Sequence, residues 1–340
     1  MSPRRAGAGA RSTPGGLVAF VGVVVAGLAF ARPAAGQVAP LGLGPADRLA
    51  WAGQVGAADS LLYLAAARAP REPVVRAQLG RWLVARGKVR PGAVLLEEAR
   101  YFGGDAGTIA RDLAPAYERL GDWRALAGLE ASPLTAGERQ RAEGLHAAPM
   151  QVTIPDSTTV ALVPIDSGPI GAVVLRVGEA SLTARIDPRV RGLVLDTAWR
   201  GRAGVEPFAE PTGRPVAGLA RRASLGALTW TRLPVRFAPT GGAVEARLGL
   251  DVLAAFRPTF DGKRGVVVLR RPVPVRAARS AGVAWPLLET PAGWAIVPPR
   301  DSLRPLASGR ARAALAGRAW TLEAARGQVT VIYANELLSR

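Results

Sequence analysis

The sequence of 340 residues predicts a multidomain α+β protein in which helices come first and strands follow. Between residues 45 and 147, apolar side chains recur at helical spacing, as at Leu79, Leu83 and Val84. From residue 150 to residue 271 the chain instead contains short β-rich runs separated by glycine and proline. The predicted parts are a targeting segment, a helical domain, a β domain and a β-rich C-terminal extension, at residues 1–36, 37–147, 150–272 and 273–340.

The N-terminal segment has the pattern of a signal peptide. Arg4 and Arg5 precede an apolar run from residue 17 to residue 30, and small residues up to Gly36 follow it. The apolar run is short for a membrane span. We therefore expect cleavage after Gly36 and export to the periplasm or to the outside of the cell. An uncleaved membrane anchor is the alternative.

Glycines in the helical domain recur at a fixed interval. Gly53, Gly87 and Gly121 are spaced by 34 residues both times, which is the period of a tetratricopeptide array. The segment therefore resembles two to three tetratricopeptide-like repeats, in which each helical hairpin buries its apolar face against its neighbours. A peptide-binding face is one implied function, and a helical cap packed on the next domain is the alternative. A second register relates Ala65, Ala99 and Pro133.

The β domain is predicted from runs of β-branched and other apolar residues that end at turn residues. Many short strands with little helix are typical of a small barrel or sandwich. In the C-terminal extension we expect a hairpin at 284–288 and 293–297 and a strand at 328–333. The strands predicted in the β domain are 151–154, 159–165, 172–177, 180–186, 192–195, 227–230, 234–237 and 265–269.

The composition removes several classes of chemistry. The chain has no cysteine, which excludes disulfides, thiolate metal sites and a thiol nucleophile. With a single histidine, His146, the chain cannot build a multi-histidine zinc site, and any Ser-His-Asp triad would have to use that residue. Carboxylates are the catalytic groups that remain in good supply, and we expect no cofactor and no metal.

The formal charge of +18 comes almost entirely from arginine, because Lys88 and Lys263 are the only lysines. The arginines are scattered among alanine, glycine and proline, and no basic stripe alternates with aromatic residues. We therefore expect no specific nucleic-acid partner. The charge predicts at most a weak attraction to a membrane surface.

Two segments of the β domain carry the most specific signal. Residues 193–198 read Leu-Val-Leu-Asp-Thr-Ala, and residues 248–256 read Leu-Gly-Leu-Asp-Val-Leu-Ala-Ala-Phe. The first resembles the Asp-Thr-Gly active-site loop of retropepsin-like aspartic proteases. The second resembles the Leu-Gly-x-Asp-x-Leu-x-x-Phe segment that closes such a domain. With the intervening segments, the resemblance covers about residues 155–271.

The resemblance implies a retropepsin-like barrel and an exported aspartic peptidase that acts on peptides or unfolded proteins. This family supplies one catalytic loop per domain of this size, so the active form would be a homodimer. Asp196 would activate water, because two paired carboxylates share one proton. Thr197 would brace the paired loops, and Ala198 stands where the family has glycine.

Several alternatives stay open at the level of sequence. A literal Asp-Ser-Gly at Asp166, Ser167 and Gly168 is a second candidate for the catalytic loop, with a polar hairpin turn as its ordinary explanation. Trp199 is bulky enough to fill the substrate cleft, and Arg200 is placed to pair with an aspartate.

The closing segment and the segment before it have alternatives of their own. Asp251 is expected to cap a helix or to bond to a loop, and residues 208–219 are expected to form a mobile flap. The rival function is a catalytically inactive envelope protein that binds or scaffolds peptides and proteins through its helical repeats.

Overall fold

The computed structural model describes residues 41–340 with the exception of 164, 166–169, 212, 215, 242–243, 272–282, 291–292, 298–318, 324–327 and 333–340. The predicted signal peptide and the Asp166-Ser167-Gly168 turn lie outside the described residues. Within the described part, the structure has no helix that is both long and apolar enough to cross a membrane.

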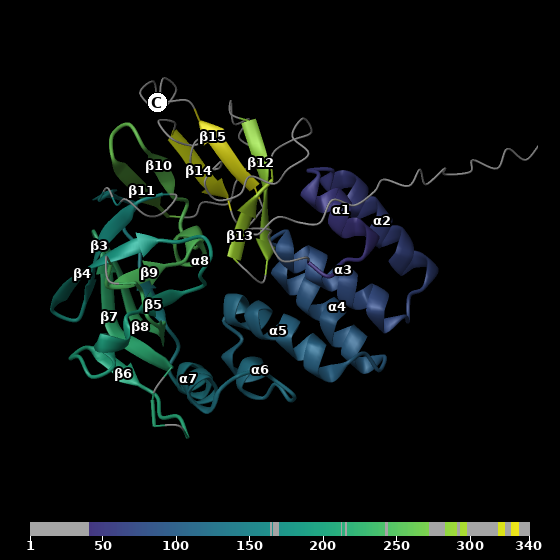
Figure 1. Ribbon diagram of the computed structural model, residues 1–340, viewed down its shortest axis with the longest axis horizontal. Helices are drawn as coiled ribbons and strands as arrows, with labels where there is room; N and C mark the ends of the chain where they lie inside the picture. Colours follow the sequence, from purple (N-terminus) through teal and green to yellow (C-terminus); the bar gives the residue numbers. More distant parts are fainter. Residues whose placement is uncertain are drawn as a thin grey trace, which may run out of the picture. The chain divides into compact units, whose positions relative to one another are not determined.

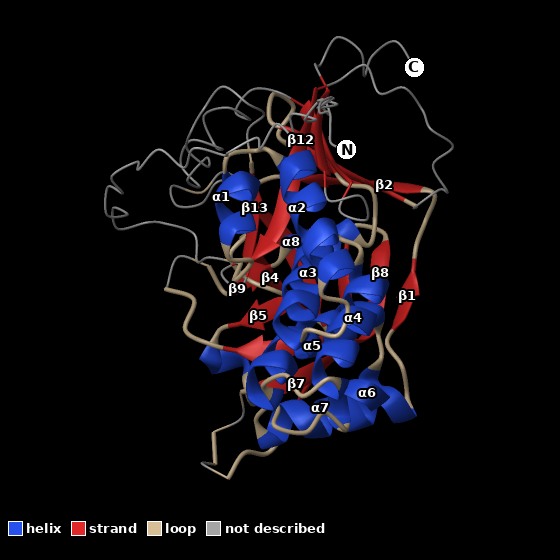
Figure 2. Ribbon diagram, turned by 90° about the vertical axis from the view of Figure 1, so that its right-hand side faces the viewer, coloured by secondary structure: helices blue, strands red, loops and turns tan. Residues whose placement is uncertain are grey.

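In the described part of the chain, seven helices precede the strands (Figure 1). Figure 2 shows α3, α4 and α5 stacked against one another, in agreement with the contacts along the chain. Apolar residues on the inner faces of α3 to α7 form a buried cluster around Leu96, Leu113 and Leu145. The bounds are α1 Pro45–Trp51, α2 Val55–Arg68, α3 Pro73–Ala85, α4 Val89–Tyr101, α5 Ala106–Leu120, α6 Trp123–Ala127 and α7 Ala136–Ala147.

The three evenly spaced glycines occupy equivalent turns. Gly53, Gly87 and Gly121 follow α1, α3 and α5, and their φ angles are 73°, 78° and 68°. Such angles are costly for residues with a Cβ atom. In each turn the glycine N–H donates to the carbonyl three residues earlier, and the next N–H donates to the carbonyl five residues before itself. The helices therefore form three hairpins with the same connection.

The third hairpin departs from the predicted register. Its second helix, α6, ends at Ala127, so Pro133 lies in a loop, whereas Ala65 and Ala99 lie in α2 and α4. Proline cannot donate the backbone hydrogen bond that a continuing helix would need. A new helix, α7, then begins at Ala136. The side chain of its N-cap, Thr135, accepts from Glu138 N, while the Glu138 carboxylate accepts from Thr135 N. This capping box fixes the start of α7.

The strands that the structure describes after these helices form two sheets. The eight-stranded sheet has the order β1-β8-β5-β9-β4-β3-β7-β6, and an additional pairing of β7 with β8 closes six of its strands into a barrel. Because the sheet closes on itself, the β domain is a barrel and not a sandwich. The bounds are β1 Gln151–Thr153, β3 Ala172–Val177, β4 Ala180–Ile186, β5 Leu193–Leu195, β6 Val205–Pro207, β7 Ala217–Leu225, β8 Leu228–Phe237 and β9 Ala246–Leu248.

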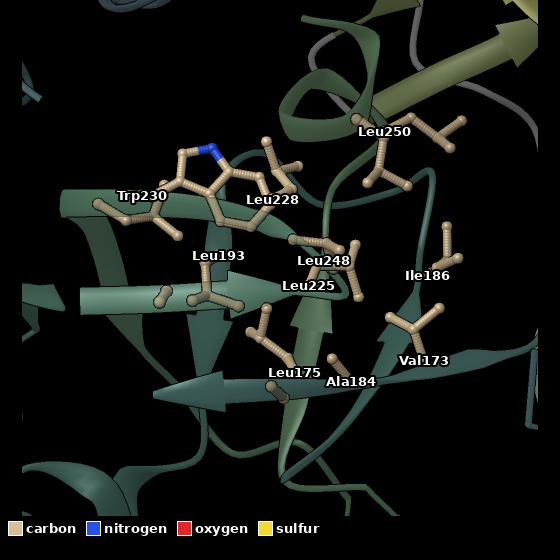
Figure 3. Close-up of a cluster of buried hydrophobic side chains, with 14 of the residues drawn as sticks. Val173, Leu175, Ala184, Ile186, Leu193, Leu225, Leu228, Trp230, Leu248 and Leu250 are labelled. Atoms are coloured by element: carbon tan, nitrogen blue, oxygen red, sulfur yellow. The ribbon is translucent and has the colours of Figure 1, made fainter. Parts of the chain in front are cut away.

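The barrel encloses a buried apolar core, shown in Figure 3. Alternate residues such as Leu175, Ala184 and Leu193 point inward, as the two-residue period of a strand requires. Trp230 covers this cluster and also meets the ring of Phe256 edge to face, with ring centroids 5.8 Å apart. Each fully buried leucine of this core contributes about 1.5–3 kcal/mol.

One predicted break in the barrel does not exist. The strands expected at 227–230 and 234–237 are a single strand, β8. Arg232 has a φ of 61° and Pro234 follows it, so the local pattern resembles a turn although the pairing with β7 continues on both sides. The Arg232 guanidinium donates to the carbonyls of Ala148 and Gly144, each at 2.9 Å, and this ties β8 to the end of α7.

The second sheet joins the middle of the chain to its C-terminal part. Its order is β13-β12-β15-β14-β10-β11-β2. β10 pairs with β11 on one side and with β14 on the other, and the rings of Phe260 and Trp320 stack at 4.1 Å between centroids. The bounds are β2 Ser157–Ala161, β10 Thr259–Asp261, β11 Val266–Arg270, β12 Val283–Thr290, β13 Gly293–Ile296, β14 Ala319–Glu323 and β15 Gln328–Ile332, and the short helix α8 spans Leu250–Ala254.

Candidate functional site

Asp196 lies at the end of a buried strand in the barrel. β5 runs parallel to β8 and antiparallel to β9, and all three residues of β5 are buried. The chain then leaves the sheet, and Asp196 N donates to Glu245 O at 2.9 Å. A 3-10 helix, Thr197–Trp199, follows directly, with Asp196 as its N-cap. The strand and the cap together fix the position of the half-buried carboxylate.

Both oxygens of the Asp196 carboxylate accept hydrogen bonds. Ala198 N donates to Oδ1 at 3.0 Å, and Thr240 N donates to Oδ2 at 3.0 Å. The Thr240 hydroxyl also lies 3.0 Å from Oδ2. These groups favour the ionised form, so the Ala198 amide, followed by the Thr240 amide, holds the pKa of Asp196 below its usual value.

The Thr240 hydroxyl has a second neighbour, the carbonyl oxygen of Val244 at 2.5 Å. A hydroxyl carries one proton, so it can donate either to Asp196 or to Val244 but not to both at once. When it donates to Val244, a hydrogen bond with Oδ2 requires a proton on the carboxylic acid. Thr240 is therefore able to partner both protonation states of Asp196.

The structure explains how alanine is accommodated after Asp196-Thr197. Among the described residues, only Ala131 and Arg232 are non-glycine residues with positive φ, so Ala198 needs no left-handed backbone. Its side chain is exposed, and its amide makes the bond to Asp196. The Thr197 hydroxyl is 3.5 Å from Asp196 of the same chain. Thus the three predicted site residues lie together in one tight turn.

Two expectations about the residues after this turn are wrong. Trp199 does not fill a cleft, because its side chain is buried in the barrel core with 6% of its surface exposed. Arg200 forms no ion pair with Asp196, and its guanidinium carbon instead lies 6.0 Å from the centre of the Phe237 ring. The 3-10 turn directs Trp199 into the core. Neither side chain forms a hydrogen bond or an ion pair with the Asp196 carboxylate, whose partners are Thr197, Ala198 and Thr240.

The predicted flap exists as a hairpin, but it is attached to the helical region. β6 and β7 pair from Val205–Ala220 to Pro207–Gly218, and residues 208–216 connect them. Phe208 is buried in the helical cluster, and the Glu210 carboxylate accepts from Gly137 N, in the first turn of α7, at 3.0 Å. The start of this loop is therefore held against the helical region. These contacts were not part of the predicted mobile flap.

The sequence predicts two alternative roles for Asp251, a helix cap or a bond to a loop, and the structure shows the second. Gly249, not Asp251, is the N-cap of α8. Both Asp251 oxygens lie within hydrogen-bond distance of Gly192 N, at 3.0 and 2.9 Å, so the carboxyl bonds to the loop that leads into β5. Protein surrounds this carboxyl except where it borders a cavity, and its burial raises its pKa to about 6.

Thr240 is not among the site residues predicted from the sequence. The residue is 44 positions from Asp196, in the loop after β8. The parallel pairing of β5 with β8 brings it to Asp196, because neighbouring parallel strands end at the same edge of a sheet, and no local sequence pattern signals this pairing. In the described part of the chain, no group of three or more His, Cys, Asp or Glu residues is arranged to hold a metal ion. His146 is exposed at the end of α7.

Comparisons with known proteins found similarity only among solved structures. No protein-family model matches the sequence, and no curated protein matches it. Among solved structures, the chain is similar to a retropepsin-like aspartic protease from Rickettsia conorii, with 12% identity and a TM-score of 0.26. The match covers 36% of this chain and 93% of that one. At this identity and TM-score the match establishes neither the fold nor a site of this chain.

Proposed function

We propose that the chain is an exported aspartic peptidase of the retropepsin type, in which two copies each contribute Asp196. One observation carries this proposal. The Asp196 carboxylate lies at the end of β5, positioned by the Ala198 amide, while Trp199 and Arg200 are directed elsewhere. A carboxylate that is held but left accessible is what activation of a water molecule needs.

The chemistry requires the second copy. A lone Asp196 has a lowered pKa and stays ionised. When two such carboxylates approach, like charge raises the pKa of one of them, and the pair then holds one proton. The ionised member takes a proton from water as the water oxygen bonds to the peptide carbonyl carbon. The protonated member gives its proton to the carbonyl oxygen, which forms a diol. The C–N bond then breaks as the nitrogen takes up the proton that came from water, and a diol hydroxyl returns a proton to the other carboxyl, so that the pair again holds one proton.

Cleavage of unfolded casein by Asp196→Asn tests this proposal between about pH 3 and pH 8. The substitution keeps the shape of the side chain but removes the charge, so cleavage should fall to the level of the control without protein. The matched control is Asp105→Asn, since Asp105 is also an N-cap carboxylate with a lowered pKa. If Asp196→Asn cuts as fast as the wild type, the assignment is wrong.

A second candidate function is a catalytically inactive envelope protein that binds peptides through tetratricopeptide-like hairpins. Two observations favour it: Thr240 occupies Oδ2 of Asp196 twice, and Glu210 attaches the flap loop to α7. In that case the protein would be monomeric by sedimentation and would leave casein intact. A dimer that cleaves casein and loses cleavage with Asp196→Asn would exclude this candidate.

Export is part of the proposal and rests on residues 1–36 alone. Signal peptidase cleavage after Gly36 would give a mature chain that begins at Gln37. N-terminal sequencing of protein recovered from the periplasm or the medium tests this cleavage directly. An intact Met1 on membrane-bound protein would instead support the uncleaved anchor.

A further inference from the structure

Four exposed arginines lie around one backbone contact at the surface of the barrel. Gly178, in the turn between β3 and β4, and Gly204, just before β6, approach so closely that a Cβ atom on Gly178 would lie 3.3 Å from Gly204 Cα. Arg221 N donates to Gly204 O at 2.9 Å, and Gly178 N donates to a carbonyl of β7 at the same distance. The arginines next to this contact form what we call the basic surface: Arg176, Arg202, Arg221 and Arg222.

The guanidinium groups of the basic surface are accessible to solvent. All four residues are exposed, and the Arg176 side chain keeps 57% of its area accessible. In the described part of the chain, the one ion pair among them joins Arg176 to Glu179 at 3.7 Å, and the Glu179 side chain is itself fully exposed. An exposed pair at this distance contributes little to stability. A partner can therefore reach these donors without breaking a buried contact.

The local charge is positive when the neighbouring carboxylates are included. Three segments surround the contact, namely residues 174–182, 199–207 and 218–226. Their only carboxylates are Glu179 and Glu206, against five arginines, so three positive charges remain. Including Asp196, just outside these segments, still leaves two. The basic surface therefore favours an anionic partner.

The basic surface begins where the Asp196 turn ends. Trp199 N donates to Asp196 O at 2.9 Å, and Arg202 N donates to Trp199 O at 3.1 Å, so successive turns join Asp196 to Arg202. The Arg202 guanidinium carbon lies 5.8 Å from the centre of the buried Trp199 ring. This cation–π contact favours a position of the charge beside the turn. A polypeptide that reaches Asp196 therefore has a cationic surface next to it.

The side chains around the basic surface favour a polypeptide over a nucleic acid or a membrane. Proteins that bind single-stranded nucleic acid stack the bases on aromatic rings, and membrane-surface elements bury apolar side chains. Among the described residues of the barrel, Val174 is the only exposed large hydrophobic side chain. Hydroxyls accompany the arginines instead. Arg176 lies opposite Ser224 in the strand pairing, and Arg222 lies opposite Thr231.

We propose that the basic surface binds an acidic segment of a polypeptide, whose carboxylates pair with the four guanidinium groups. Guanidinium is planar and matches a carboxylate with two parallel hydrogen bonds. The role of this segment rests on the proposed peptidase function, in which it belongs to the substrate and lies near the bond that is cut. Polypeptides with acidic segments are then the preferred substrates.

Fluorescence anisotropy on the full chain carrying Asp196→Asn measures binding without cleavage. The probe is a labelled peptide of alternating glutamate and glycine, and its counterpart has glutamine in place of glutamate. We expect the glutamate peptide to bind more tightly by about tenfold or more at low salt. Its affinity should fall as the salt concentration rises from about 0.01 M to about 0.15 M, because salt screens exposed charges.

Arg221→Gln combined with Arg222→Gln is the decisive double variant, and its affinity for the glutamate peptide should fall by about tenfold. Arg90→Gln combined with Arg124→Gln is the matched control, because it makes the same change in net charge at exposed positions of α4 and α6. With Asp196 intact, the decisive pair should raise KM for an acidic substrate and leave kcat unchanged, as expected when only binding is lost.

Three results would overturn the proposal. These are equal affinity for the glutamate and glutamine peptides, an equal loss of affinity in the decisive pair and its control, and equally tight binding of oligothymidylate or phosphatidylglycerol vesicles. Arg176→Gln combined with Arg202→Gln repeats the test if the decisive pair does not fold. Binding of the acidic peptide without cleavage in the wild type overturns only the proposed peptidase, whereas cleavage without a preference for acidic substrates overturns only this inference.

Discussion

Thr240 donates its backbone N–H to the carboxylate of Asp196 at 3.0 Å, and its hydroxyl contacts the same oxygen at 3.0 Å. This relationship joins the ends of two parallel strands, β5 and β8. It places a neutral group with both a donor and an acceptor beside the residue proposed to activate water. The protonation state of Asp196 is therefore coupled to whether the Thr240 hydroxyl donates to Asp196 or to Val244.

Removing the Thr240 hydroxyl should raise the pKa of Asp196. Thr240→Val keeps the backbone donor but deletes the side-chain contact that helps to lower this pKa. A carboxyl NMR titration would measure the shift, and the acid limb of any cleavage profile should move to higher pH with it. Thr153→Val, at an exposed position of β1, is the control. An unchanged Asp196 titration in Thr240→Val would show that the hydroxyl bonds only to Val244.

Asp251→Asn should change how stability depends on pH. The folded-state pKa of Asp251 is raised to about 6 from 3.8, so the folded chain holds this proton more tightly than the unfolded chain. The wild type therefore loses stability as pH rises from about 4 to 6, by at most about 3 kcal/mol. Asparagine keeps an oxygen acceptor for Gly192 N but has no proton to lose in this pH range. The stability of Asp251→Asn relative to the wild type, measured by urea unfolding, should therefore increase from about pH 4 to pH 6.

Asp187→Asn is the control, because the contribution of Asp187 to stability should change with pH in the opposite direction. Burial of Asp187 acts to raise its pKa, but hydrogen bonds from Arg189 outweigh burial and lower it. The wild type then gains stability from this group above the unfolded pKa of 3.8 and loses it as pH falls. If both variants change in the same direction over the same pH window, the assignment of a raised pKa to Asp251 is incorrect.

Glu210 should control the opening of the loop between β6 and β7. Glu210→Ala removes the acceptor for Gly137 N at the start of α7, whereas Glu210→Gln keeps an oxygen acceptor in the same place. We expect faster hydrogen exchange in residues 208–216 for the alanine variant and little change for the glutamine variant. The loss of this bond should lower stability by about 0.5–1.5 kcal/mol. Equal exchange in all three proteins would mean that the buried Phe208 alone anchors the loop.

The contact between α3 and α4 should not tolerate a side chain at Gly92. A Cβ atom there would lie 2.8 Å from Gly80 O and 2.9 Å from Val84 N, so Gly92→Ala should lower the thermal midpoint. Gly56→Ala is the matched control in α2, because a Cβ atom there meets nothing within 4 Å. That substitution should stabilise by up to about 1 kcal/mol, since alanine is the better helix former. A Gly92→Ala protein as stable as Gly56→Ala would contradict the close packing.

The local features of the fold could be predicted from the sequence because they depend on neighbouring residues. The strands at 172–177 and 180–186 agree with β3 and β4, and the turn at Asp196 follows its buried strand as expected. β7 is absent from the predicted strands, because Ala217–Leu225 is rich in alanine and arginine, and its strand conformation depends on pairing with β3, β6 and β8.

The non-local parts of the site could not be predicted. Thr240 reaches Asp196 only through the parallel pairing of β5 with β8, and no local pattern signals that pairing. The cavity that Asp251 borders depends on residues from both the helices and the strands. Trp199 was misplaced for a related reason, because the 3-10 turn after Asp196 decides which way the indole points.

The pairing of β10 with β14 has a practical consequence for measuring oligomeric state. A fragment that stops at residue 272 would keep β10 and β11 but lose β14, so β10 would expose an open edge and Phe260 would lose the ring that stacks on it. Open edges of this kind pair readily with other chains. A dimer formed by such a fragment would reflect the missing strand, and only the chain that retains residues 319–323 can report whether two Asp196 turns meet.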